Sequence, residues 1–131
     1  MNNRFKFRVW DKLSERMIYH HNDNQQHFII DLNGRFHNLQ NGSGGDDYVI
    51  QQYTGLNDNN DDPIYEGDIL KNPYDVSNKI IGQVLYESDH GGYIFQWKRR
   101  GQDYKITNLN CDVAFESVIV GNIFENSELL K

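Results

Sequence analysis

The sequence predicts a mainly β protein with little helix, and three observations carry that prediction. Apolar and polar residues alternate in short runs, which is the period of a half-buried strand. Turn-forming residues, among them 11 glycines and the pair Asn33-Gly34, separate these runs at short intervals. The 7 Phe, 8 Tyr and 2 Trp supply the aromatic area for a core, in which disordered chains are poor.

Length and charge narrow the class of protein further. The chain has 131 residues, enough for one domain or two very small ones. Its 13 basic and 19 acidic residues give a net charge of −6, and the mean hydropathy is −0.77. No apolar run reaches the roughly 18 residues of a transmembrane helix, and the charged start predicts no secretory signal. A single cysteine excludes an internal disulfide, so we expect a cytoplasmic protein.

The first strand is expected at residues 4–9, where apolar and basic side chains alternate. One face would be apolar, and the other would carry the basic residues Arg4, Lys6 and Arg8. Residues 17–19 would return as the partner strand. The pair Asn33-Gly34 then predicts a type I′ hairpin, with flanking strands at 27–32 and 35–39. One more strand, at 48–53, completes an N-terminal β-hairpin region that the pattern assigns to residues 1–62.

A second series of strands is expected after Pro63. Its members are residues 64–70, 82–87, 93–97, 104–106, 113–115 and 118–120. These strands suffice for a small SH3-like barrel, which we assign to residues 63–131, packed with the N-terminal hairpin layer or continuous with it. Asn126 is a candidate N-cap for a single helical turn at the end.

Three blocks of the sequence resemble the YopX family of bacteriophage and prophage proteins. They are residues 5–19, residues 52–70 and residues 118–130, so the resemblance spans nearly the whole chain. It implies a mainly β, phage-encoded accessory protein in a bacterial host cell, and it implies no reaction. The acidic loop 57–62 departs from the family pattern. The family-like residues, which we interpret as structural, are Tyr53, Gly55, Tyr65, Glu66, Gly67, Asp68, Gly121 and Asn122.

Two acidic motifs are candidates for catalytic or metal sites. Glu66 and Asp68 share one face of a strand and could share a proton or hold a metal ion. A bend in which Asp68 accepts from nearby backbone is the favoured alternative. Loop 58–62 has oxygen ligands at alternate positions, but Pro63 and Ile69 stand where a calcium loop needs Gly and Glu. A solvated turn is therefore expected there.

The remaining reactive residues predict neither a cofactor nor an enzyme. His20, His27 and His37 could meet on neighbouring hairpins around a metal ion, although surface histidines are favoured. Cys111 lies beside Asp112, whose charge opposes the thiolate, and we interpret it as structural. Phosphate-binding loops, dinucleotide fingerprints and nucleophile elbows do not occur in the sequence.

A basic and aromatic run suggests what the protein contacts. Its residues are Trp97, Lys98, Arg99, Arg100 and Lys105. Cations beside aromatic rings are typical of single-stranded nucleic-acid binding. The charge of −6 opposes that function, and Tyr93, Phe95 and Trp97 also alternate as a core-facing strand would. We therefore expect a protein partner or a second copy to bind at an open strand edge, for which residues 4–9 are one candidate, with nucleic acid as the alternative.

Overall fold

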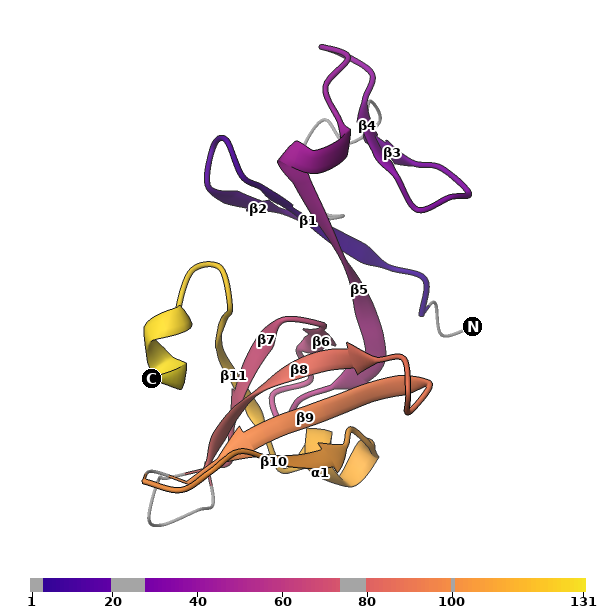
Figure 1. Cartoon of the computed structure of the whole chain (residues 1–131). Coiled ribbons are helices and arrows are strands. Elements are labelled where there is room, and N and C mark those ends of the chain that lie inside the picture. Colours follow the sequence, from indigo (N-terminus) through magenta and orange to yellow (C-terminus); the bar gives the residue numbers. More distant parts are fainter. Residues whose placement is uncertain (1–3, 20–27, 74–79, 100) are drawn as a thin grey trace. The chain divides into compact units, whose positions relative to one another are not determined.

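The computed structural model describes residues 4–19, 28–73, 80–99 and 101–131, and it is mainly β, as predicted (Figure 1). The chain divides into two compact units. The N-terminal unit is Phe5–Gln52, and the C-terminal unit is Tyr53–Lys131 together with Arg4. The domain boundary at 62–63 and the SH3-like geometry of the second half stay predictions. Among the described residues, no helix has the length and hydropathy to span a membrane.

The N-terminal unit is built around β1 (Phe7–Asp11), which runs antiparallel to two neighbours. On one side lies β2 (Arg16–Ile18), and on the other lies the start of β5 (Tyr48–Asn57). Asp11 Oδ1 accepts from the backbone N–H of Leu13, at 3.0 Å, and so closes the turn between β1 and β2. The predicted pairing of the first two strands is therefore confirmed.

A second hairpin joins β3 (Phe28–Ile30) to β4 (Phe36–Asn38). The hairpin was predicted correctly, but its type I′ turn was wrong. Only Gly34 takes a positive φ in this turn, at 80°, while Asp31 Oδ1 accepts from the N–H groups of Asn33 and Arg35. The carboxylate of Asp31 thus stabilises a longer loop in which a type I turn precedes a left-handed glycine.

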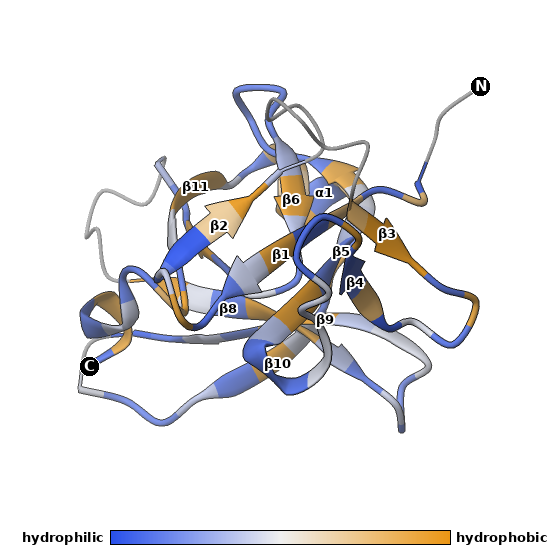
Figure 2. Ribbon diagram, turned by 90° about the horizontal axis from the view of Figure 1, so that it is seen from above, coloured by the Kyte–Doolittle hydropathy of each residue, from blue (hydrophilic) through white to orange (hydrophobic). Residues whose placement is uncertain are grey.

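Each unit has its own hydrophobic cluster. In the N-terminal unit Val9, Ile18 and Phe36 are buried, and the Phe36 ring lies 4.5 Å from the Tyr48 ring. A short 3-10 turn, η2 (Gly45–Asp47), precedes β5. The apolar residues lie mostly on strands, whereas the connecting loops are polar (Figure 2). This pattern agrees with the predicted series of short strands separated by turns.

The C-terminal unit contains a five-stranded antiparallel sheet in the order β10-β9-β8-β7-β11. Beside it, β5 continues past Tyr53 and pairs with the short β6 (Pro63–Tyr65). In Figure 1, β8 and β9 are the long strands of the sheet and β10 runs along β9. The strands are β7 (Asp68–Lys71), β8 (Ile81–Glu87), β9 (Gly92–Lys98), β10 (Lys105–Asn108) and β11 (Val118–Asn122).

The cluster of this unit combines strands with one short helix. Ile64, Leu70 and Val84 are fully buried, and Phe95 and Ala114 complete the cluster. Ala114 belongs to α1 (Cys111–Phe115), so the strand predicted at 113–115 was wrong. The helix begins there because Asn110 Oδ1 caps it, accepting from the Val113 N–H at 3.0 Å.

The chain ends in a 3-10 turn, η3 (Ser127–Leu130), close to the helical turn predicted there. Asn126 precedes it but makes no cap hydrogen bond with its side chain. Asn126 Oδ1 instead accepts from the backbone N–H of Asn122. The N-cap role predicted for Asn126 was therefore wrong, because its amide is used to hold the end of β11.

Candidate protein-binding edge

Strand β10 forms one edge of the five-stranded sheet, and among the described strands it pairs only with β9. The Leu109 N–H donates to the Tyr93 carbonyl, so Leu109 is at a hydrogen-bonded position of the ladder. Thr107 and Lys105, two and four residues earlier, are at hydrogen-bonded positions of the same register. In an antiparallel ladder the intervening residues turn their N–H and C=O groups away from the partner strand. Those residues are Ile106 and Asn108, so their backbone groups face outward.

Two lysine side chains lie over aromatic rings along this edge. Lys105 Nζ lies 5.4 Å from the centre of the Trp97 ring, and Lys98 Nζ lies 4.9 Å from that of Tyr104. The polar atoms of both rings are also bound, because Trp97 Nε1 donates to Thr107 Oγ1 and the Tyr104 hydroxyl donates to the Leu130 carbonyl. Ile106 lies next to Lys105 on β10 and is 55 % exposed. We call the following five residues the lysine–aromatic edge: Trp97, Lys98, Tyr104, Lys105 and Ile106.

Trp97 is less accessible than a base-stacking residue would be. Its ring packs against the buried cluster of the C-terminal unit, and Lys105 lies over the ring. Base stacking needs an exposed aromatic face. The arrangement therefore favours cationic side chains held in place by rings over rings offered to nucleobases.

The opposite edge of the sheet, at β11, is covered where the strand begins. Asp58 Oδ2 accepts from the Ile119 N–H at 2.9 Å, and the Asn59 N–H donates to the Ser117 carbonyl at 2.8 Å. Asp58 Oδ1 also accepts from the N–H groups of Asn60 and Asp62. Asp58 is only 5 % exposed, whereas Asn60, Asp61 and Asp62 are exposed. The solvated turn predicted at 58–62 therefore describes the later residues of the loop but not Asp58.

The basic residues of the predicted contact surface do not all lie together. Trp97, Lys98 and Lys105 belong to the lysine–aromatic edge, and Arg99 is exposed at the end of β9. Arg100 lies outside the described residues. Of the predicted residues of the first strand, Lys6 and Arg8 belong to the N-terminal unit, whereas Arg4 is exposed and belongs to the C-terminal unit.

The expectation that Arg8 faces solvent on a basic strand face was wrong. Arg8 is 3 % exposed, and its Nε donates to Gln51 Oε1 at 2.8 Å. The physical reason is that β1 is an inner strand between β2 and β5, and both faces of it are buried, since Val9 and Trp10 are also 9 % exposed or less. A strand buried on both faces has no solvent side for a basic row. The expectation of an open edge at 4–9 was wrong for β1 as well, because β1 pairs on both sides.

The Glu66-Gly67-Asp68 motif forms a backbone bend. Asp68 Oδ2 accepts from the Tyr65 N–H at 2.8 Å, and Asp68 is 2 % exposed. Gly67 has a φ of 85°, donates to the Val84 carbonyl and accepts from the Ile123 N–H. Glu66 lies next to this bend and is half-buried. The contacts of Asp68 match the backbone-bonded alternative that was favoured for this motif.

The other family-like residues also lie at points where segments of the C-terminal unit meet. Tyr53 and Tyr65 are cross-strand partners with ring centres 5.8 Å apart, and Gly55 takes a φ of 88°. At Gly121 an added Cβ would lie 2.5 Å from Asn126 Oδ1. Asn122 Oδ1 accepts from the N–H groups of Phe124 and Glu125.

The described histidines and the cysteine do not gather into a site. His37 Nε2 lies 2.9 Å from Asp31 Oδ2 on the β3–β4 hairpin, while Cys111 is exposed. His20 and His27, predicted as partners of His37 around a metal ion, lie outside the described residues, as does His21. Within the described ranges, no group of three His, Cys, Asp or Glu residues could hold a metal ion.

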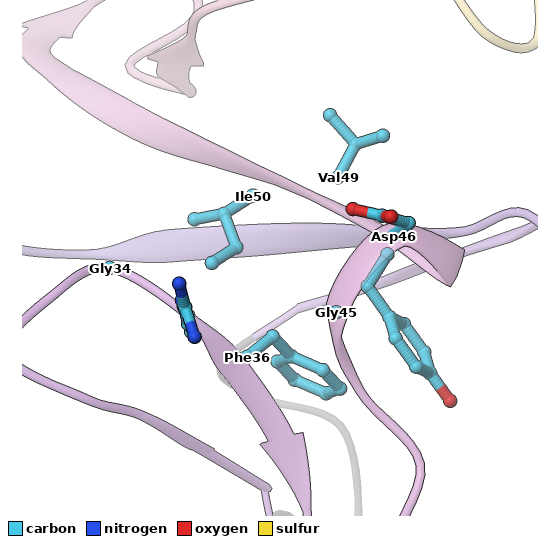
Figure 3. A pocket seen from close by; sticks show the side chains of 8 residues that line it. Gly34, Phe36, Gly45, Asp46, Val49 and Ile50 are labelled. Carbon is cyan, nitrogen blue, oxygen red and sulfur yellow. The ribbon is translucent and has the colours of Figure 1, made fainter.

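The N-terminal unit has a pocket of about 580 Å³ beside the start of β5. Figure 3 shows Phe36 and Ile50 near each other, with Asp46 and Val49 on the other side of the view. Tyr48 and the charged side chain of Arg35 also line it. The Tyr48 hydroxyl is hydrogen-bonded to Ser43 Oγ. Its lining offers apolar side chains together with one carboxylate, Asp46, and one guanidinium group, Arg35.

Comparison with known proteins identifies the family. A crystal structure of protein EF1440 from Enterococcus faecalis matches with a TM-score of 0.60 and 26 % sequence identity, covering 96 % of this chain and 97 % of that one. A comparison with curated proteins finds no significant match. The model of the family described as YopX protein matches residues 6–131. This match spans nearly the whole chain, so the chain belongs to the YopX family.

Proposed function

We propose that this protein is a non-enzymatic phage or prophage accessory protein that acts in the host cytoplasm by binding another protein. The observation that carries the proposal is the lysine–aromatic edge. Along β10 it brings the exposed apolar side chain of Ile106 and two lysines beside the outward backbone groups of Ile106 and Asn108. Edge strands of this kind bind other chains by backbone pairing.

A nucleic-acid ligand fits this surface less well. The Trp97 ring packs on the core and is covered by Lys105, while Lys98 lies over Tyr104. The chain as a whole carries a charge of −6, which repels a phosphate backbone beyond the immediate neighbourhood of these lysines. A polypeptide ligand can bind without exposed aromatic rings to stack on and without a long row of cationic side chains.

The proposal that the protein is not an enzyme rests on the hydrogen bonds of two carboxylates, Asp58 and Asp68. Asp68 accepts from the Tyr65 backbone, and Asp58 accepts from three backbone N–H groups. A general base needs to reach a substrate proton. Carboxylates that are buried and bonded to backbone in this way hold the fold together, which supports a structural role for both.

Site-specific photo-crosslinking in the bacterial host tests the proposal. A photoreactive amino acid replaces Ile106 in one variant and Tyr86 in a matched control, because both side chains are 55 % exposed. We expect position 106 to crosslink a distinct protein that position 86 does not capture. Crosslinks to the protein itself would indicate self-assembly, and crosslinks to nucleic acid would support the alternative. Equal, diffuse crosslinking from both positions would contradict the proposal.

A further inference from the structure

We propose that the edge of β10 binds an extended, acidic segment of the partner protein, which adds to the sheet as a sixth strand. The inference rests on the proposed function and specifies how the partner is recognised. Three features of the described residues carry it: the direction of the backbone groups of β10, the position of two lysines, and the cover over the opposite edge of the sheet.

The backbone supplies the first step. Lys105 and Thr107 are paired with Trp97 and Phe95 of β9, so their N–H and C=O groups are used within the sheet. Ile106 and Asn108 present theirs on the outer side. An incoming antiparallel or parallel strand can pair with these groups without any rearrangement of β9 or β10. The β10 strand is therefore a template for one added strand.

The lysines supply the second step, because they favour carboxylates. Lys98 and Lys105 belong to neighbouring strands, and each ammonium group lies near an aromatic ring. The rings restrict the two long side chains, so less side-chain entropy is lost when a carboxylate pairs with them. Arg99 adds a third cation at the end of β9. Lys105 lies on the same face of the sheet as its partner Trp97, and Lys98, the next residue of β9, lies on the opposite face. A strand in which acidic and apolar residues alternate carries its carboxylates on one face, so they would lie beside Lys105 or beside Lys98.

The same charges disfavour a second copy of this chain at the edge. Two β10 strands paired with each other would bring Lys105 and its neighbours close to the same cations of the other copy. Like charges that lie opposite each other in a sheet are destabilising. Lysine on an edge strand is also a common protection against aggregation. If protection is the only role of these lysines, no acidic segment will bind at β10.

The other edge of the sheet explains why β10 is the site. At β11 the register shifts between Ile119 and Gly121, and Asp58 accepts from the Ile119 N–H. A bulged strand whose first residues are already bonded to a loop is a poor template for pairing. Within the described part of this sheet, β10 is thus the edge with regular outward backbone groups.

The first experiment measures peptide binding to the full chain by NMR. The probe is a short peptide of alternating glutamate and valine with blocked ends, and the control peptide has lysine in place of glutamate. We expect the glutamate peptide to shift the amide signals of Ile106 and Asn108 and to slow their hydrogen exchange. Equal binding of the lysine peptide would overturn the acidic class, and binding of neither peptide would overturn the proposal.

Two variants separate backbone pairing from side-chain contact. Ile106→Pro removes an outward N–H while leaving the bonds from β10 to β9 in place, and proline is tolerated on edge strands. Ile106→Ala is the matched control, because it keeps the N–H and removes the apolar side chain. We expect the proline variant to bind the peptide about tenfold more weakly than the alanine variant. Equal affinity of the two variants would overturn strand addition.

A charge variant gives a test that does not depend on whether the Ile106→Pro variant folds. Lys98→Gln combined with Lys105→Gln should weaken binding of the glutamate peptide roughly fivefold and flatten its dependence on salt. An unchanged affinity and salt dependence would overturn the role of the lysines. If the proline variant still captures the cellular partner, the protein binds partners through another surface. If the wild-type chain captures none, the proposed function itself fails.

Discussion

Gly82 shows how a single residue governs the packing of the C-terminal sheet. It is the cross-strand partner of Trp97, and a Cβ added to it would lie 2.2 Å from the Gln96 carbonyl oxygen. That neighbour is backbone and cannot turn aside. Strand β9 can therefore approach β8 this closely only because position 82 has no side chain.

We expect Gly82→Ala to lower the free energy of unfolding by about 3 kcal/mol, since two strands must move apart. Gly92→Ala is the control: Gly92 begins β9, has no atom within 4 Å of an added Cβ and needs no positive φ. Denaturant unfolding of both variants checks this. A Gly82→Ala protein as stable as the control would show that the sheet adjusts at little cost.

Tyr93 on β9 carries a perturbed hydroxyl. Burial raises the pKa of Tyr93 to about 12, and the charges of Glu66 and Tyr86 add to the effect. The neutral hydroxyl is therefore favoured in the folded state. Its contribution to stability is complete below the ordinary tyrosine pKa of 10.0 and is lost as the pH rises from there through about 12.

Replacing Glu66 with Gln should lower the pKa of Tyr93, because one of the charges that opposes the phenolate is removed. The chemical shift of the Tyr93 Cζ carbon, followed against pH, measures it. Glu116→Gln changes an exposed carboxylate that does not act on Tyr93 and is the control. Identical titration of the two variants would mean that Glu66 does not contribute to the raised pKa of Tyr93.

At the scale of elements, the loop at 57–62 is held to β11 by one side chain. The two oxygens of Asp58 accept from Asn60, Asp62 and Ile119. We expect Asp58→Ala to cost about 3 kcal/mol, because three backbone donors lose their acceptor. Asp62→Ala, which removes an exposed carboxylate and keeps the backbone, should be near neutral. Thermal unfolding of the pair decides between a structural and a merely solvated loop.

The β3–β4 hairpin is expected to weaken in acid. The hydrogen bond from His37 lowers the pKa of the Asp31 carboxyl, and the backbone N–H groups of Arg35 and Asn33 lower it further. The stabilisation is present above the ordinary pKa of 3.8 and is lost as the pH falls below that value through the lowered pKa.

Amide hydrogen exchange at Ile30 and Phe36 measures this acid response. In Asp31→Asn the side-chain carbonyl still accepts from Asn33 and Arg35, but the charge is gone, so the pH response should flatten. A hairpin whose protection is the same at acidic and neutral pH in the wild-type chain would contradict the role of the Asp31–His37 pair.

These elements also show what the sequence could predict. Alternation located the strands because side chains on a strand point to opposite faces. The same alternation at Val113 and Phe115 predicted a strand where α1 forms, because a five-residue helix is too short to show a helical period. Burial of Arg8 and Asp58 depends on segments far away in the sequence, Gln51 and Ile119, which local pattern does not report. The open edge at β10 depends on the order of the strands in the sheet.

For the whole molecule, the two hydrophobic clusters belong to different units. One contains Val9, Ile18 and Phe36, and the other contains Ile64, Leu70 and Val84 together with Phe95 and Ala114. The clusters share no residue, and each is built within its own unit. A defect in one cluster should therefore remain local if the units open independently.

Phe36→Ala tests this independence. Phe36 is 3 % exposed, and its loss should destabilise the N-terminal unit by roughly 3–5 kcal/mol. Hydrogen exchange should accelerate at Val9 and Ile18 while Val84 and Phe95 keep their protection. Ile29→Ala, on the same hairpin but at a 43 % exposed position, is the control. An equal loss of protection in both units would show that they unfold together, and peptide binding at β10 would then depend on the N-terminal core as well.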